Sequence, residues 1–188
     1  MLLYTIGHSN RSLEDFLAIL KEHDIQSLVD IRSLPGSNKF PYFNSKNLAG
    51  VVSENGMNYF WLPKLGGLRR TRKEFPSRNT GLTSPSFRSY ADYMSTEDFR
   101  EGVGELIETA SNSTTAYMCA EAVYWRCHRR LLSDYLVAHG LDVIHILGLK
   151  QVSPHKVKAP PPEGGGFRFV DCKSTSRIVT YREVVIAG

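Results

Sequence analysis

The sequence has few cysteines, no long hydrophobic run and little excess of either charge. Its 188 residues include three cysteines, an odd number, so a framework of paired disulfides is not expected. No apolar run approaches the roughly 20 residues that a membrane-spanning helix needs. The apolar start has no basic segment before it and ends after six residues, which does not fit a signal peptide. We therefore expect a cytoplasmic protein with no membrane partner.

The charge and composition place the chain among ordinary globular proteins. The 23 basic and 19 acidic residues give a formal net charge of +4, which permits an anionic partner without requiring one. Hydrophobic residues make up 41% of the chain, which excludes global disorder. The length suits one domain with its own core. We assign residues 1–150 to a single α/β domain that carries the site. Residues 151–188 are assigned to a proline- and glycine-rich linker and a C-terminal strand extension packed on the same domain.

Short apolar segments alternate with segments of helical periodicity along the first 150 residues. The first apolar segment is followed by Ser12 and Asp15, which are spaced like a capping box at the start of a helix. Strand, helix and strand follow within about 30 residues, the size of a βαβ unit with parallel strands. The pattern predicts an α/β fold whose mainly parallel sheet is flanked by helices, with a possible antiparallel C-terminal addition at residues 167–170 and 178–186. Strands are predicted at 2–6, 25–31, 58–62, 114–119 and 142–147, and helices at 13–20, 45–56, 86–94, 96–110 and 126–139. Ser45 is predicted to cap the second of these helices, and Gly140 to stop the last.

Polar and charged residues follow the predicted strands. In an open parallel sheet, ligands bind outside the carboxyl ends of the strands. We therefore expect these side chains to gather at one edge of the sheet, where acid, base, thiol and guanidinium groups would form a site. The residues concerned are His8, Asp30, Arg32, Cys119, Glu121, Cys127 and His128.

The segment after the fourth predicted strand carries the strongest signal. Cys127, His128 and Arg129 stand where a helix should begin, and a helix N-terminus attracts anions. A cysteine at that position gains thiolate character, whereas a histidine is pushed toward its neutral form. Cys119 could equally fill the core as a small apolar residue. The carboxylate of Glu121 follows a buried strand and precedes an aromatic pair, so it needs a partner.

Thiol and metal chemistry both fit this segment in part. An anion cradle around a thiolate needs a glycine-bearing loop whose amides point inward. The loop of six residues between Cys119 and Arg126 contains no glycine, which counts against such a cradle. A divalent metal such as zinc could be held by Cys119, Cys127 and His128, although the spacing of the two cysteines is not that of a familiar zinc knuckle. Acid/base chemistry, with arginines holding an anionic substrate, is the third alternative.

A basic run offers a different function. Arg69, Arg70, Arg72 and Lys73 lie in a long irregular segment and could follow the phosphates of a nucleic acid. A solvated loop explains the run equally well, and the small net charge leaves no pervasive basic face. The alternative function is therefore a non-catalytic module that binds nucleic acid or docks a partner through this loop.

Five separated motifs resemble the uncharacterised family known as domain of unknown function 488, in the family's order across residues 3–150. They are Tyr4 to Ser9, Leu28 to Pro35, Pro41 to Asn44, Leu65 to Gly67, and the pair Cys119 to Glu121 with Cys127 to Arg129. The resemblance implies a compact α/β domain with a shared site at these motifs and no established reaction. Many relatives carry a proline between the two cysteine motifs. This chain has Val123, Tyr124 and Trp125 there, so a different loop backbone is expected.

We predict an enzyme-like site for an anionic, phosphate-bearing ligand, such as a nucleotide or the end of a nucleic acid, with acid/base or thiol-dependent chemistry favoured. The catalytic candidates are His8, Asp30, Cys119 and Glu121. The candidates for substrate binding are Arg32, Asn44, Cys127, His128 and Arg129. A zinc ion is considered at Cys119, Cys127 and His128, and the nucleic-acid alternative uses Arg69, Arg70, Arg72 and Lys73.

Overall fold

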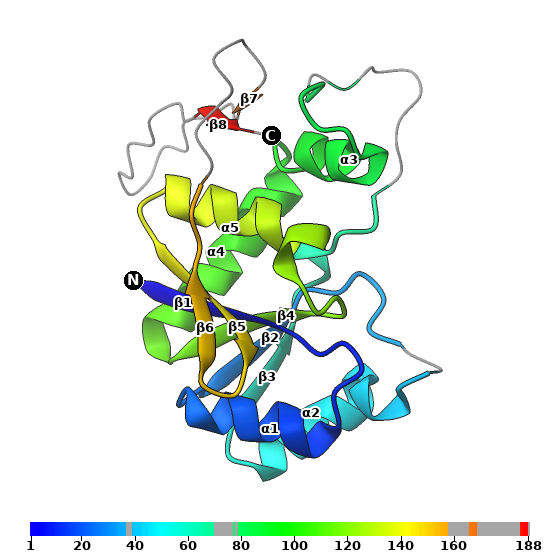
Figure 1. Ribbon diagram of the computed structural model, residues 1–188, viewed down its shortest axis with the longest axis vertical. Coiled ribbons are helices and arrows are strands. Elements are labelled where there is room, and N and C mark those ends of the chain that lie inside the picture. The colour runs from blue at the N-terminus through cyan, green and yellow to red at the C-terminus, as the bar shows by residue number, and fades with distance from the viewer. Residues whose placement is uncertain (37–38, 70–76, 78, 158–165, 169–184, 188) are drawn as a thin grey trace.

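A computed structural model describes residues 1–36, 39–69, 77, 79–157, 166–168 and 185–187. Figure 1 shows a sheet at its centre with helices on both sides. The strands are β1 (Leu2–Gly7), β2 (Ser27–Asp30), β3 (Asn58–Trp61), β4 (Thr115–Cys119), β5 (Asp142–Gly148), β6 (Gln151–Pro154), β7 (Gly166–Arg168) and β8 (Val185–Ala187). The α-helices are α1 (Leu13–Glu22), α2 (Ser45–Glu54), α3 (Pro85–Tyr93), α4 (Glu97–Asn112) and α5 (Arg129–Ala138), and the 3₁₀ turns are η1 (Pro41–Phe43), η2 (Pro63–Leu65) and η3 (Tyr124–Arg126).

The central sheet has the strand order β3-β2-β4-β1-β5-β6. Its first five strands along the chain pair in parallel, and β6 runs antiparallel to β5. The predicted α/β class with a mainly parallel sheet is therefore confirmed. Each of the five predicted strands forms close to its predicted position.

Both faces of the sheet are buried. The residues of β2 and β4 are buried throughout, as expected for parallel strands covered on two sides. One hydrophobic cluster joins α1 and α2 to the sheet and includes Phe16, Leu20, Leu28 and Leu48. A second cluster joins α3, α4 and α5 to the other face and includes Tyr90, Phe99, Leu106 and Leu132. The two helical layers enclose the sheet (Figure 1), so its carboxyl edge is the place where polar side chains can gather.

The connections change direction between the neighbouring strands β1 and β4. From β1 the chain runs through α1 to β2 on one side, and from β4 it runs through α5 to β5 on the other. Since α1 and α5 pack in different hydrophobic clusters, these connections leave the sheet on opposite faces. Such a topological switch point opens a crevice at the carboxyl ends of the two strands. Gly7 pairs with Cys119 at this point, so the segments that follow both strands border the crevice.

Two helices begin at residues other than the predicted ones. Asn44 is the N-cap of α2, and Ser45 is the first helical residue, so the prediction that Ser45 caps this helix is wrong. Helix α5 begins at Arg129 because Tyr124–Arg126 form a 3₁₀ turn and Cys127, which follows it, has an extended backbone. Gly140 follows the end of α5 with a φ of 82°, a left-handed conformation that suits glycine and confirms the predicted stop.

The C-terminal part adds a strand to the central sheet and contains, in its described residues, part of the predicted antiparallel tail pair. Residues Gln151–Pro154 form β6 against β5, so the central sheet continues past residue 150. β7 and β8 pair in antiparallel fashion as a separate two-stranded sheet. Most of the predicted linker, and most of the predicted tail strands, lie outside the described residues. No helix in the described part of the chain combines the length and apolar character needed to cross a membrane.

Candidate functional site

A pocket of about 380 Å³ lies at the carboxyl ends of the parallel strands, beside the switch point. Five predicted site residues line it: Arg32, Cys119, Glu121, Cys127 and His128. The other predicted residues of the main site, His8, Asp30, Asn44 and Arg129, do not belong to its lining. The structure thus brings together residues that follow β2, end or follow β4, and precede α5, as the parallel topology predicts. The remaining candidates lie behind the wall of the pocket.

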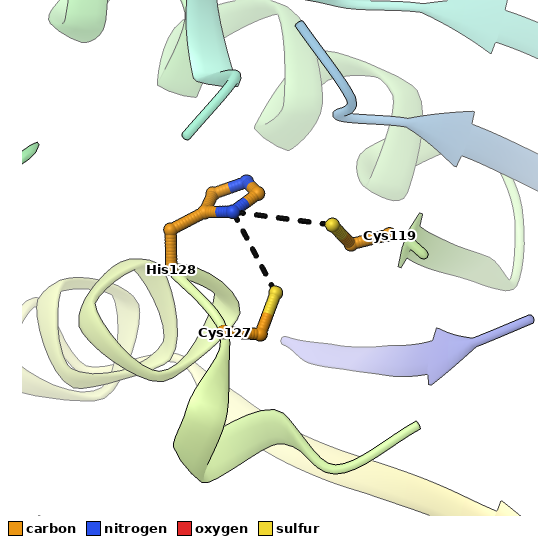
Figure 2. Close-up of side chains that lie close together, drawn as sticks. All are labelled: Cys119, Cys127 and His128. Atoms are coloured by element: carbon orange, nitrogen blue, oxygen red, sulfur yellow. Dashed lines mark hydrogen bonds between the residues drawn. The ribbon is translucent and has the colours of Figure 1, made fainter. Parts of the chain in front are cut away.

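Two cysteines and a histidine converge in this wall. Figure 2 shows Cys119 at the end of β4 opposite Cys127 and His128, which precede α5. The Nδ1 atom of His128 lies 3.6 Å from the Cys127 sulfur and 3.9 Å from the Cys119 sulfur. The three potential ligand atoms lie within 4.8 Å of one another. The other ring nitrogen of His128, Nε2, is buried without a hydrogen-bond partner among the described residues, so His128 meets the sulfurs through Nδ1.

The pKa values of the two thiols are shifted in opposite directions. The pKa of Cys127 lies well below the ordinary thiol value because Cys119 donates a hydrogen bond to its sulfur, and His128 and Arg129 favour the thiolate further. The same hydrogen bond raises the pKa of Cys119, and burial adds to this rise. The backbone N–H of Arg129 also donates to the Cys127 sulfur at 3.5 Å. Negative charge is therefore stabilised at Cys127, at the N-terminal end of α5.

Arg129 is a buried cation behind the pocket. Its side chain is 1% exposed, and its guanidinium donates to the Thr5 hydroxyl and to the carbonyl oxygens of Glu121 and Ala122. No described carboxylate forms an ion pair with it, and its Nε has no partner among the described residues. Arg129 therefore holds the loop after β4 in place and adds positive charge beside the pocket, instead of pointing into it as a substrate ligand would.

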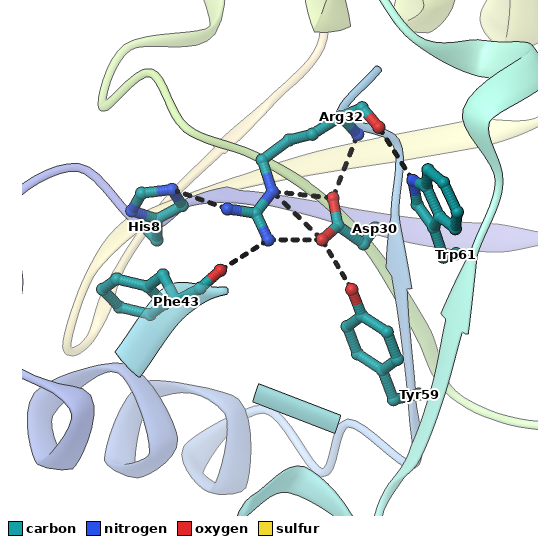
Figure 3. A network of polar contacts seen from close by, with 6 residues as sticks. All are labelled: His8, Asp30, Arg32, Phe43, Tyr59 and Trp61. Atoms are coloured by element: carbon teal, nitrogen blue, oxygen red, sulfur yellow. Dashed lines mark hydrogen bonds and ion pairs between the residues drawn. The ribbon is translucent and has the colours of Figure 1, made fainter. Parts of the chain in front are cut away.

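Arg32 forms a buried network with Asp30. Its guanidinium donates to both carboxylate oxygens of Asp30 and to the carbonyl oxygen of Phe43, and Figure 3 shows it enclosed by these groups. Tyr59 donates to the same carboxylate at 2.7 Å, and its pKa is raised by burial and by the charge of Asp30, so the phenol keeps its proton. Trp61 donates to the carbonyl oxygen of Arg32. Asp30 is fully buried, and its contacts make it a residue that orients Arg32.

His8 lies on the opposite side of Arg32 and is 3% exposed (Figure 3). Its Nδ1 lies 2.9 Å from the carbonyl oxygen of Ser9, which can only accept, so Nδ1 carries the hydrogen. Its Nε2 lies 3.3 Å from Nη1 of Arg32, which can only donate, so Nε2 is unprotonated. Burial and the charge of Arg32 lower the pKa of His8 to about 4, and its ring stacks on Phe43 at 4.2 Å. His8 is thus a neutral acceptor that positions Arg32.

The neutral state of His8 predicts a loss of stability in acid. Below about pH 6.5 the unfolded chain binds a proton at His8 that the folded chain does not bind until the pH nears 4. This difference corresponds to at most about 3 kcal/mol of unfolding free energy, lost as the pH falls through that window. Urea unfolding from pH 7 to pH 4.5 should show a shallower decline for His8→Asn than for the wild type. Equal slopes in the two proteins would contradict the assignment, whatever the stability of the variant at pH 7.

Glycines allow close approach at three points of the site. A Cβ on Gly67 would overlap the imidazole of His128, and one on Gly66 would overlap Ser33. A Cβ on Gly7 would overlap the carbonyl group of Glu121. The two motifs that contain these glycines therefore bring backbone directly against the segments that carry the functional side chains.

Glu121 and Asn44 differ in how the structure places them. The side chain of Glu121 is exposed and lines the pocket, so its carboxylate is solvated and does not need the partner expected for it, and it is accessible to a ligand. Asn44 caps α2 and follows the Phe43 carbonyl that binds Arg32, outside the pocket lining. Both assignments as functional residues stay predictions.

The basic run is described only at Arg69. Its guanidinium lies 3.6 Å from the centre of the Tyr93 ring and donates to the carbonyl oxygens of Pro63 and Lys64. These contacts attach the segment after η2 to the end of α3. Arg70, Arg72 and Lys73 lie outside the described residues.

Some pocket residues were not among the predicted site residues. Arg126 is exposed and lines the pocket, and Ser33, Ser86 and Phe87 join it there. In the sequence, Arg126 marks only the end of the six-residue loop after Cys119, and no pattern there identifies it as a site residue. Ser86 and Phe87 belong to the first turn of α3, and no local pattern indicates that this helix reaches the carboxyl edge of the sheet.

A buried histidine pair supports the loop of η3. Nε2 of His155 donates to Asp134, and Nδ1 of His155 forms a hydrogen bond with Nε2 of His145, each at 2.8 Å. Burial, with the nearby His155, lowers the pKa of His145 to about 3. The ring of Tyr124 lies flat on His145, with ring centres 3.4 Å apart and planes at 4°. This contact fixes the turn that leads to Cys127. His145 lies in an apolar strand, and nothing in the sequence pattern joins it to Asp134.

Comparison with known proteins gives one match. No curated protein and no solved structure matches the chain. The family model for the domain of unknown function DUF488 matches residues 12–136, more than half of the chain. The match spans the motifs around Asp30, Gly67, Cys119 and His128. The chain therefore belongs to the DUF488 family.

Proposed function

We propose that this protein is an enzyme whose pocket binds an anionic, phosphate-bearing ligand, such as a nucleotide or the end of a nucleic acid. The proposal is supported by an excess of guanidinium groups around the pocket. Arg32 and Arg126 line it, Arg129 lies behind its wall, and Glu121 is the one carboxylate among the lining residues. This excess is the single observation that carries the proposal.

Pairing within the site leaves part of the positive charge free. Asp30 neutralises Arg32 through its bidentate contact. Arg129 has no such carboxylate among the described residues, but it lies beside the Cys127 thiolate, which offsets part of its charge. The side chain of Arg126 is exposed and forms no ion pair with a described residue, so its charge is the one free to meet a ligand. The pocket also adjoins the N-terminal end of the ten-residue helix α5, whose dipole favours negative charge. A ligand with a phosphate group would complete this charge balance.

The rest of the pocket suits a ligand with an apolar part. Its volume of about 380 Å³ lies in the range of small-molecule sites. Leu34 and Leu68 are largely exposed in its lining, and Phe87 lies with them. Exposed leucines next to guanidinium groups fit a molecule that joins a phosphate to a sugar or base.

Two kinds of reactive group face the same space. Glu121 presents an accessible carboxylate that can take or give a proton. Cys119 and Cys127 present sulfur atoms, and Nδ1 of His128 lies within 3.9 Å of both. His8 and Asp30 act through Arg32 and are positioning residues. The reaction we propose therefore uses acid/base or thiol-dependent chemistry on the bound anion.

Arg126→Ala tests the ligand class. We expect inorganic phosphate, pyrophosphate and 5′-AMP to raise the melting temperature of the wild type, at least one of them clearly. Loss of one charge-assisted hydrogen bond costs about 1.5–3 kcal/mol, so the variant should bind the effective probe roughly 10 to 100 times more weakly. The measurement is the dissociation constant from thermal shift or calorimetry.

Matched variants separate this result from general effects. Glu121→Gln removes the negative charge from the pocket at constant size, so it should leave phosphate affinity unchanged or increase it. Arg100→Ala removes an arginine that pairs with Glu97 on α4, outside the pocket lining, and should bind like the wild type. The proposal fails if no phosphate-bearing probe stabilises the wild type, or if Arg126→Ala and Arg100→Ala respond alike.

A further inference from the structure

The Cys119, Cys127 and His128 cluster has the dimensions of a metal site. Zinc binds thiolate sulfur at about 2.3 Å and histidine nitrogen at about 2.0–2.1 Å. At tetrahedral angles these bonds separate a sulfur from a nitrogen by about 3.6 Å. The observed separations from His128 Nδ1 are 3.6 Å to Cys127 and 3.9 Å to Cys119. All three ligand atoms lie within 4.8 Å of one another, so one ion can reach them together.

Hydrogen bonds alone explain this convergence poorly. The Nδ1 atom of His128 carries at most one hydrogen, so it can donate to only one of the two sulfurs, and its 3.9 Å contact with Cys119 is near the limit for such bonds. A cation between the three atoms uses a lone pair of each, so it joins all three at once in place of this long contact and the bond from Cys119 to Cys127. The backbone N–H of Arg129, which donates to the Cys127 sulfur, then serves as the outer contact that orients a metal-bound thiolate.

The cluster offers three ligands on the wall of the pocket. Among the described residues, no further histidine, cysteine or carboxylate joins the group. Cys119, Cys127 and His128 all line the pocket, so the remaining corner of a tetrahedron opens into it. Three protein ligands with an open position are typical of catalytic zinc sites, whereas structural sites are closed by four. We propose that Cys119, Cys127 and His128 bind one zinc ion whose fourth coordination position faces the pocket.

The ligand types select the ion. Thiolate and imidazole together favour zinc over the hard cations magnesium and calcium, which take oxygen ligands. Both thiols release their protons on binding, and two thiolates balance the charge of Zn²⁺. The positive charge of Arg129 then remains beside the pocket. This inference concerns the cofactor, and it stands whether or not the pocket takes the phosphate-bearing ligand proposed above.

Gly67 provides the space for the ligand histidine. Its backbone packs so closely that a Cβ would overlap Nδ1 of His128, the nitrogen assigned to the metal. A side chain at this position would therefore push the imidazole out of line with the two sulfurs. The glycine explains how a ligand on the α5 side can reach Cys119 on β4.

Metal content and the cobalt spectrum test the site in the full chain. Protein purified under reducing conditions without chelator should contain about one zinc per chain by elemental analysis. Replacement by Co²⁺ should give a thiolate-to-cobalt charge-transfer band and the intense visible bands of a tetrahedral centre. Added cyanide should shift the visible bands, because the fourth position is open to small ligands. These readouts need neither a substrate nor an activity assay.

Variants assign the ligands. Cys119→Ser, Cys127→Ser and His128→Gln should each weaken zinc binding by at least about tenfold, with circular dichroism reporting whether the fold persists. Cys172→Ser, which removes the third cysteine, is the matched control and should keep its zinc. The inference is overturned if the reduced wild type binds no zinc and gives no thiolate–cobalt band. It is also overturned if cyanide leaves the spectrum unchanged or if Cys172→Ser loses the metal, because the fourth position would then be closed.

Discussion

Asp30→Ala is expected to lower the free energy of unfolding by about 3 to 5 kcal/mol, the cost of leaving one member of a buried ion pair alone. Arg32 is 6% exposed and donates to both oxygens of Asp30, and Tyr59 donates to the same carboxylate. Without the carboxylate, a guanidinium and a phenol lose their acceptor away from water. For a chain of this size, the melting temperature should fall by about 6 to 20 °C. Thermal and urea unfolding measure the effect.

An exposed pair gives the comparison. Glu97→Ala removes the partner of Arg100 on the surface of α4, where such pairs contribute less than about 1 kcal/mol. The double variant Asp30→Leu, Arg32→Leu should cost less than the sum of the two single changes, since no uncompensated charge remains. A cost of less than about 1 kcal/mol for Asp30→Ala would show that the network does not hold this part of the fold. Arg32 variants are therefore poor probes of ligand binding, because they also destabilise the fold. Arg126 is exposed, so its variants report on binding without this loss of stability.

Most of the sheet follows from the sequence because its strands are short apolar runs. Once those runs are read as parallel strands, the segments after β2 and β4 must reach the same edge, and Arg32, Cys119 and Glu121 do line one pocket. Strand β6 is not predicted from the sequence, because Gln151–Pro154 has no apolar run and lies at the edge of the sheet. An edge strand that pairs with only one neighbour carries little of the hydrophobic pattern.

The roles of individual residues depend on contacts that no local pattern encodes. Asp30 and Glu121 are both carboxylates near the end of a buried strand, yet Asp30 is fully buried and Glu121 is exposed. The difference arises because Arg32, which follows β2, and Tyr59, from β3, both meet Asp30 inside the fold. No equivalent group meets Glu121 among the described residues. Burial of a carboxylate thus depends on how such partners, here one nearby and one distant in sequence, come together in the fold, and sequence spacing alone cannot distinguish the two.

The convergence of the three proposed zinc ligands also depends on contacts between elements that are far apart in the sequence. Cys119 ends β4, and the chain must return through η3 to bring Cys127 and His128 opposite it. That return depends on Tyr124 stacking on His145 and on Arg129 holding the carbonyl oxygens of Glu121 and Ala122. The sequence identifies the ligand types, but the turn that brings them together is built by residues in β5 and α5.

Gly7→Ala is expected to disturb this turn more than any surface change. Gly7 ends β1 beside Cys119, and an added Cβ would overlap the backbone carbonyl of Glu121 and crowd the guanidinium of Arg129. Because the obstacle is backbone, rotation of a side chain cannot relieve it, so we expect a loss of about 3 kcal/mol, the upper end for overpacking. Zinc and phosphate probes should also bind less well. Gly50→Ala is the matched control, since no atom lies within 4 Å of its Cβ position in α2, and it should stabilise the protein by about 0.5–1 kcal/mol. A loss below about 0.5 kcal/mol for Gly7→Ala would show that the loop after β4 moves freely, and a site that depends on its fixed position would then lose its structural basis.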